Sequence, residues 1–142
     1  MPHASRRLLP LLLAVGVASC GPAAEQVRKV TYPANFDYLT RGEVRTEMEK
    51  LAVAVVKLDH YLRGAEDGSG IDRASVVAML DQIDQAASSL DTGGSAHNHP
   101  VIEAGMPAFR RDIQAARKLA AQDPPNYYLA GAVAGACGYC HR

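Results

Sequence analysis

The sequence predicts an all-α protein, an antiparallel up-down-up-down four-helix bundle that spans residues 38–142. Apolar residues recur at helical spacing in four successive segments of this region. Short connections rich in Gly, Pro or polar residues separate the segments. Because amphipathic helices with short connections pack as antiparallel neighbours, this pattern favours a bundle.

The first expected helix begins at Thr40 and ends near Gly64. Thr40 and Glu43 form a capping-box pattern at its start, and Gly64 is a plausible terminating glycine. Its apolar residues alternate at spacings of four and three, which is a heptad seam that needs a helical partner. The seam consists of Val44, Met48, Leu51, Val55, Leu58 and Leu62.

The second and third expected helices cover about 72–90 and 100–122. The second has a single apolar stripe made of Val76, Leu80, Ile83, Ala87 and Leu90. The third is expected to bury Ile102, Met106, Phe109, Ile113, Ala116 and Leu119. Because proline interrupts helical hydrogen bonding, we expect either a separate first turn before Pro107 or a helix that begins at Pro107.

The fourth expected helix takes Asp123 as its N-cap and Pro124 as its first residue, and continues to His141. Its middle, residues 130–136, contains only Ala, Gly and Val. Glycine weakens intrinsic helix stability, but small residues permit close approach of a neighbour or of a flat macrocycle. We therefore expect this helix to be marginal without a bound cofactor.

The fourth helix ends in Cys137-Gly138-Tyr139-Cys140-His141, which is the C-x-x-C-H attachment signal for a c-type haem. Two thiols at this spacing can bond to the two vinyl groups of one porphyrin, and the adjacent histidine can ligate its iron. On a helix the three side chains project within about 100° of one another. We therefore predict one covalently attached haem c on the last helix.

Two other interpretations of the cysteine pair remain open. A redox-active dithiol normally has its first cysteine at a helix N-terminus, whereas Cys137 follows an expected helix. A tetrahedral zinc site needs four ligands, and the sequence has no second C-x-x-C or H-x-x-x-H pattern to complete one.

The amino-terminal residues 1–19 have the pattern of a lipoprotein signal peptide. Arg6 and Arg7 precede an apolar run of 11 residues, which reaches only about 16 Å as a helix and is too short to span a bilayer. Small residues lead to Cys20, which resembles the lipidated cysteine of bacterial lipoproteins. The alternative is an ordinary signal peptide with Cys20 merely nearby.

Residues 20–37 lack sustained periodicity and contain Pro22 and Pro33, so we interpret them as a lipidated start and a flexible tether.

Charge and motifs exclude several classes of function. Without residues 1–19 the chain has 13 Lys and Arg against 15 Asp and Glu, with no basic stripe for nucleic acid. No Ser-His-Asp, paired-carboxylate or phosphate-loop pattern indicates a hydrolase or an NTPase. We therefore expect no enzymatic activity.

The segment A-G-A-C-G-Y-C-H, residues 134–141, together with an Arg- and Met-containing first helix, resembles the cytochrome c-prime family and its low-spin relatives. The resemblance covers about residues 38–142. It implies that Cys137 and Cys140 form the thioether bonds, that His141 is the proximal iron ligand and that Met48 is the distal candidate. It also implies a possible homodimer through the first two helices, to which Ala52 and Val56 are suited.

Bundle topology places other candidates for the distal position near His141. The start of the first helix, the loop before the third and the end of the fourth should share one end of an up-down bundle. An open position, His97 or His99, and Met106 are therefore alternatives to Met48, whereas His60 belongs at the far end and Met79 is interpreted as core filler.

These expectations describe a membrane-tethered monohaem cytochrome that carries electrons between redox partner proteins, its iron cycling between Fe(II) and Fe(III). The alternatives are a cytochrome that binds NO or CO at an open distal face, and a zinc-binding or structural lipoprotein. Cys20 would anchor the chain on the periplasmic side of a bacterial membrane. By analogy, the absence of Asp after Cys20 favours the outer membrane.

Overall fold

The computed structural model describes residues 21–65, 70–93 and 95–141. Its long helices are α3 (Arg41–Arg63), α4 (Arg73–Ser88) and α5 (Pro100–Ala120). The shorter elements are α2 (Pro22–Thr31), α6 (Tyr128–Ala132), the 3₁₀ helix η1 (Val133–Tyr139) and two strands, β1 (Phe36–Asp37) and β2 (Ala96–His97). The predicted all-α class is confirmed.

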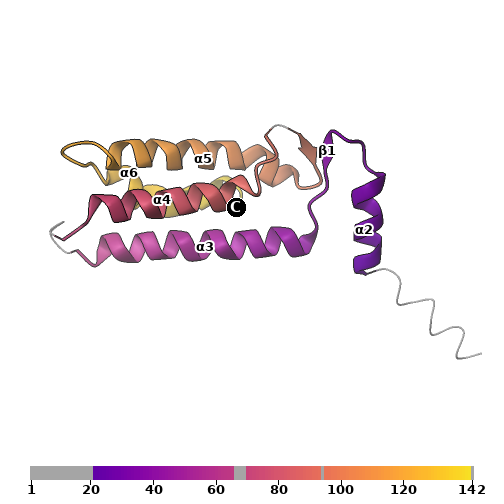
Figure 1. Ribbon diagram of the computed structural model, residues 1–142, viewed down its shortest axis with the longest axis horizontal. Coiled ribbons are helices and arrows are strands. Elements are labelled where there is room, and N and C mark those ends of the chain that lie inside the picture. The colour runs from indigo at the N-terminus through magenta and orange to yellow at the C-terminus, as the bar shows by residue number, and fades with distance from the viewer. Residues whose placement is uncertain (1–20, 66–69, 94, 142) are drawn as a thin grey trace, which may run out of the picture.

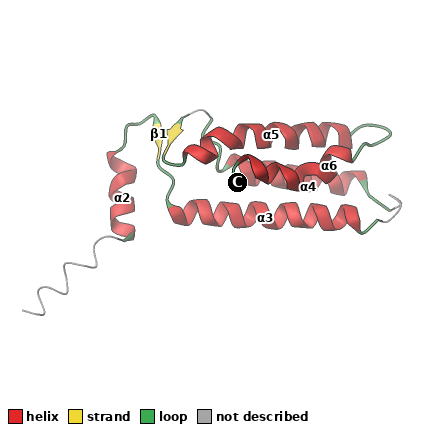
Figure 2. Ribbon diagram, turned by 180° about the vertical axis from the view of Figure 1, so that it is seen from behind, coloured by secondary structure: helices red, strands yellow, loops and turns green. Residues whose placement is uncertain are grey.

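The long helices lie lengthwise beside one another, and α6 with η1 returns along them (Figure 1). Successive elements run in opposite directions, and α2 lies across one end of the bundle (Figure 1 and Figure 2). The α5 helix packs against α4, α6 and η1, while α3 packs against α4 and also touches α6 and η1. The largest fully buried side chains are Leu58, Val76, Leu80, Ile83, Leu90 and Ile113, all of them on predicted apolar stripes.

Side chains cap both α3 and α4, and the cap of α3 is the capping box that the sequence predicts. Thr40 Oγ1 accepts the Glu43 N–H at 3.2 Å, and the Thr40 N–H donates to Glu43 Oε2 at 2.8 Å, which completes the capping box. At α4, Asp72 Oδ2 accepts the Ser75 N–H at 2.8 Å. The α3 helix ends at Arg63, and the N–H of its C-cap residue Gly64 bonds to the His60 carbonyl.

The α5 helix corrects both expectations about Pro107. It begins at Pro100 and continues as one helix through Pro107, so there is no separate first turn and no start at Pro107. Ile102, Gly105 and Met106 are buried on the first two turns. Burial of this face outweighs the single hydrogen bond that Pro107 cannot donate.

The fourth helical segment differs from its prediction in both start and type. Asp123 and Pro124 precede the helix. Residues 121–124 form a turn and bends, residues 125–127 are irregular, and the Asn126 N–H bonds to the Leu119 carbonyl at 3.1 Å. The α-helix begins only at Tyr128 and tightens into η1 after Ala132. Gly131, Gly135 and Gly138 account for this weakness, since glycine has a poor helix propensity.

Part of the segment interpreted as a flexible tether is helical. Its residues Pro22–Thr31 form α2, which takes Pro22 at its first turn. The predicted signal peptide 1–19 and the predicted lipid site Cys20 lie outside the described residues. None of the helices in the described ranges is both long enough and apolar enough to cross a bilayer.

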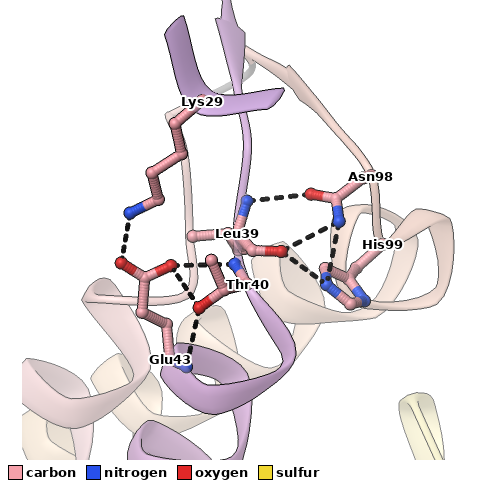
Figure 3. A network of polar contacts seen from close by, with 6 residues as sticks. All are labelled: Lys29, Leu39, Thr40, Glu43, Asn98 and His99. Carbon is pink, nitrogen blue, oxygen red and sulfur yellow. Dashed lines mark hydrogen bonds and ion pairs between the residues drawn. The ribbon is translucent and has the colours of Figure 1, made fainter. Parts of the chain in front are cut away.

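A small parallel ladder joins the segment before α3 to the loop before α5. Phe36 pairs with Ala96, and Asp37 pairs with His97. Next to this ladder, the Leu39 N–H donates to Asn98 Oδ1 and the Leu39 carbonyl accepts from Asn98 Nδ2, both at 2.8 Å (Figure 3). These bonds fix the starts of α3 and α5 at the same end of the bundle.

Candidate haem-binding site

A cavity of about 340 Å³ lies between α3, α5 and the end of η1. Its size is within the range of roughly 300–1,000 Å³ that is typical of ligand pockets. It brings together the residues of the C-x-x-C-H motif and two methionines. Its lining residues are Arg45, Met48, Glu49, Leu51, Ala52, Val55, Met106, Phe109, Ala136, Cys137, Cys140 and His141.

A turn at the end of η1 presents the three motif residues to this cavity. The Cys137 carbonyl accepts hydrogen bonds from the Cys140 N–H at 3.3 Å and from the His141 N–H at 3.0 Å. Cys137 is exposed and Cys140 is half-buried, and they do not form a disulfide with each other. Two thiols and one imidazole are therefore held on a single turn, although this turn is not the α-helix that the sequence predicts.

Three contacts fix this turn on the bundle. The Tyr139 hydroxyl donates to Asp112 Oδ2 of α5 at 2.8 Å. Ala136 is buried in the core, 9% exposed. Gly105 of α5 lies so close to the turn that a β-carbon there would be 2.4 Å from Cys140 Sγ. The position of Cys140 therefore depends on the absence of a side chain at residue 105.

The Cys140 thiol lies in a partly buried environment. Burial raises its pKa, and the neighbouring Cys137 raises it further. This environment favours the neutral thiol over the thiolate at Cys140. Within the described ranges, His, Cys, Asp and Glu form no group of three or more that could hold a metal ion.

The two methionines that line the cavity differ in how deeply their side chains are buried. Met106 is 2% exposed and is packed in the core. Met48 is half-buried on α3, between the core and the cavity. Its thioether can therefore move into the cavity without opening the core, whereas Met106 would have to leave its packing.

The two histidines proposed as alternative ligands lie elsewhere. His97 is 6% exposed, and its Nδ1 accepts the His99 N–H at 3.1 Å. His99 Nε2 lies 3.1 Å from the Leu39 carbonyl oxygen, within the network beside β1 (Figure 3). Neither residue lines the cavity that contains Cys137 and Cys140. His60 is on the last turn of α3, at the opposite end of the bundle, and Met79 packs against the core.

Several residues of the site were not identified from the sequence. Glu49, like Arg45, is an exposed charged residue that lines the otherwise largely apolar cavity. Gly105 and Asp112 of α5 contact the turn that carries the C-x-x-C-H motif. No motif marks these positions, because their role arises only where η1 packs against α5.

The donor atoms of the cavity fit a covalently bound haem. Two thiols, an imidazole and a thioether surround an apolar space, and these are the attachment groups and axial ligands of c-type haem. Comparisons of the chain with known protein families, with curated proteins and with solved structures gave no match. The assignment therefore depends on the chemistry of these residues alone.

Proposed function

We propose that this protein is a membrane-tethered monohaem c-type cytochrome that carries electrons, with a four-helix bundle of the cytochrome c-prime type. The observation that supports this proposal is the convergence of Cys137, Cys140, His141 and Met48 on one largely apolar cavity. These residues come from α3 and from the end of the chain, so their meeting is a property of the fold and not of the motif alone.

Each residue has a distinct role in the proposal. Cys137 and Cys140 would form the thioether bonds, His141 would be the proximal ligand and Met48 the distal ligand. The haem supplies one-electron chemistry as its iron cycles between Fe(III) and Fe(II). The largely apolar walls would lower the polarity around the bound haem, and a Met ligand would raise its reduction potential.

A cytochrome that binds NO or CO is the second candidate, and the exposure of the site favours it. Met48 is held neither by a hydrogen bond nor by full burial. If its thioether stays off the iron, the distal position is open to a diatomic gas. The two candidates share the covalent haem and differ only at this position.

Coexpression with the bacterial haem-attachment machinery tests the proposal. We expect a coloured protein whose haem remains bound after denaturation, and whose mass equals the polypeptide plus one haem. Replacing both Cys137 and Cys140 with Ser should remove the denaturation-resistant haem. A colourless wild-type protein of unmodified mass would overturn the proposal.

The visible spectrum distinguishes the two candidates. A far-red charge-transfer band in the ferric protein indicates a thioether on the iron and supports the electron carrier. Absence of the band, together with CO binding to the ferrous protein, would support the gas-binding cytochrome instead.

A further inference from the structure

The α2 helix has an apolar face that nothing in the described structure covers. Ala23, Val27 and Val30 lie within about 60° of one another around the helix. Val27 is 58% exposed and Val30 is 82% exposed, the latter more than any other large hydrophobic residue that the structure describes. A helix with one apolar face in water is normally matched to an apolar partner or to a membrane surface.

The other side of α2 is fixed to the end of the bundle. Ala24, Glu25 and Arg28 line a polar cavity together with Tyr38, Arg41 and His99. The Arg28 guanidinium donates to the Tyr38 hydroxyl at 3.4 Å. Lys29 forms an ion pair with Glu43 of α3, next to the Thr40 cap (Figure 3). The apolar face therefore points away from the bundle.

The position of α2 in the chain identifies what covers this face. The helix begins at Pro22, two residues after Cys20. A lipid on Cys20 would hold the start of α2 within about 7 Å of the bilayer, because an extended chain spans at most about 3.6 Å per residue. The first apolar surface that the chain forms after its anchor is then Ala23, Val27 and Val30.

We propose that α2 lies on the lipid bilayer, with Val27 and Val30 inserted among the headgroups. This inference rests on the proposed lipidation of Cys20. A bilayer is favoured over a second copy of the chain because a lipid at Cys20 would give the membrane a high effective concentration at α2. The face is also too small to form a stable protein interface, since a specific interface buries about 800 Å² on each partner.

This contact sets the orientation of the candidate haem site. Because α2 lies across one end of the bundle, that end faces the membrane and the opposite end points away (Figure 1). Met48 is seven residues after the start of α3, about 10 Å along the helix. The cavity is therefore in the half of the bundle near the membrane, within reach of a redox partner at its surface.

A single tryptophan can test this arrangement, because the chain contains none. The full-length lipidated protein carrying Val30→Trp is placed in phosphatidylethanolamine–phosphatidylglycerol vesicles, with or without brominated acyl chains. Val53→Trp on α3 is the matched control, since Val53 is also exposed, at 54%. The emission ratio between the two lipid types cancels any energy transfer to a bound haem.

We expect brominated lipid to lower the emission of Val30→Trp by about twofold or more and to leave Val53→Trp nearly unchanged. Equal emission of Val30→Trp in both lipids, in protein that floats with the vesicles, would overturn the proposal. Equal quenching at both positions would also overturn it, since the whole bundle would then lie on the membrane.

A second form of the protein separates this proposal from lipidation. Cys20→Ser protein, with a hexahistidine tag in place of residues 1–19, is tethered to vesicles that contain nickel-chelating lipid. If Val30→Trp is quenched in this nickel-tethered protein while the protein that retains Cys20 does not float with vesicles, the α2 contact is supported and the lipid at Cys20 is refuted. If Val30→Trp is not quenched in the tethered protein while the protein that retains Cys20 does float, the α2 contact alone is refuted.

Discussion

Gly105 of α5 faces Cys140, which belongs to the turn that carries the C-x-x-C-H motif. A β-carbon on Gly105 would lie 2.4 Å from Cys140 Sγ and 3.0 Å from the Tyr139 carbonyl oxygen. Real β-carbons essentially never come within 3.0 Å of another atom, so a side chain at residue 105 must shift Cys140 Sγ or the turn that carries it. Gly105 thus determines where Cys140 is held relative to the cavity.

Gly105→Ala should therefore impair haem attachment. The added methyl group must push the turn away from α5 or distort the core, at a cost of about 1–3 kcal/mol in the free energy of unfolding. We expect the amount of covalent haem per polypeptide to fall. The measurements are the haem-to-protein absorbance ratio and the denaturant midpoint.

Gly135→Ala is the matched control for this change. A β-carbon at Gly135 would have nothing within 4 Å, and the residue lies in the same helical segment as Cys137. Its haem content should equal that of the wild type, and its stability should not decrease, because alanine favours helix over glycine. An equal loss of haem in both variants would contradict the role of Gly105.

Met48→Ala should change the iron ligation and leave the fold intact. Because Met48 is half-buried, its truncation creates little core cavity. In the proposed electron carrier the variant should lose the far-red ferric band and gain CO binding in the ferrous state. Met79→Ala, which truncates another partly buried methionine of the bundle, should change neither signal. An unchanged ferric spectrum in Met48→Ala would contradict the ligand assignment.

The sequence predicted those parts of the fold in which local pattern and packing agree. The capping box of α3 and the buried stripe of α4 occur where the sequence places them. The start of the fourth segment was predicted less well. Asp123 and Pro124 are residues that occur both at helix starts and in turns, so their identity does not distinguish the two. There the Asn126–Leu119 backbone bond determines the structure. The ten-residue helix α2 was not predicted, because Pro22 and Pro33 were interpreted as marks of an irregular segment. This helix places Lys29 beside Glu43.

The sequence marks the candidate donor residues but not the residues that hold them in place. Cys137, Cys140 and His141 stand out because the C-x-x-C-H signal has a fixed local spacing, and the structure places all three at one cavity. The exclusion of His97 and His99 from the cavity needed the structure, since bundle topology places the loop that carries them at the correct end. Gly105 is one of 12 glycines, and only the approach of η1 distinguishes it.

Cys20→Ser should release the protein from the membrane fraction. If lipid on Cys20 is the anchor, its loss leaves only the small contact of α2, which is too weak to retain the chain. The measurement is the distribution of the protein between the soluble and membrane fractions after cell breakage. Continued membrane association of the variant would contradict the anchor, whereas unchanged haem content would show that the two ends of the chain act independently.

Arg110→Ala should destabilise the bundle more than Arg117→Ala. Arg110 joins α5 to Asp84 and Asp91, both at 2.8 Å, and its side chain is 26% exposed. Its removal leaves two half-buried carboxylates without a cation, which costs about 2–3 kcal/mol. Arg117 pairs with Asp81, where both side chains are about half exposed, so its removal should cost at most about 1 kcal/mol. Denaturant unfolding of the two variants measures the difference, and equal losses would contradict it.

The Lys29–Glu43 pair predicts how the α2 end of the bundle responds to acid. The hydrogen bond from Lys29, followed by that from the Thr40 backbone, lowers the pKa of the Glu43 carboxyl. A carboxylate with a lowered pKa in the folded state contributes stability above its unfolded pKa, and this contribution is lost as the pH falls through the folded value. The free energy of unfolding should therefore decrease below about pH 5.

Two variants test this origin of the acid response. Glu43→Gln should reduce the decrease in the free energy of unfolding, because the amide does not titrate yet can still accept the Thr40 bonds. Lys29→Gln should have an intermediate effect, since it removes the largest cause of the shift and keeps the capping box. Denaturant unfolding of the three proteins between pH 3 and pH 7 measures these slopes, and identical slopes would show that the pair is absent in solution.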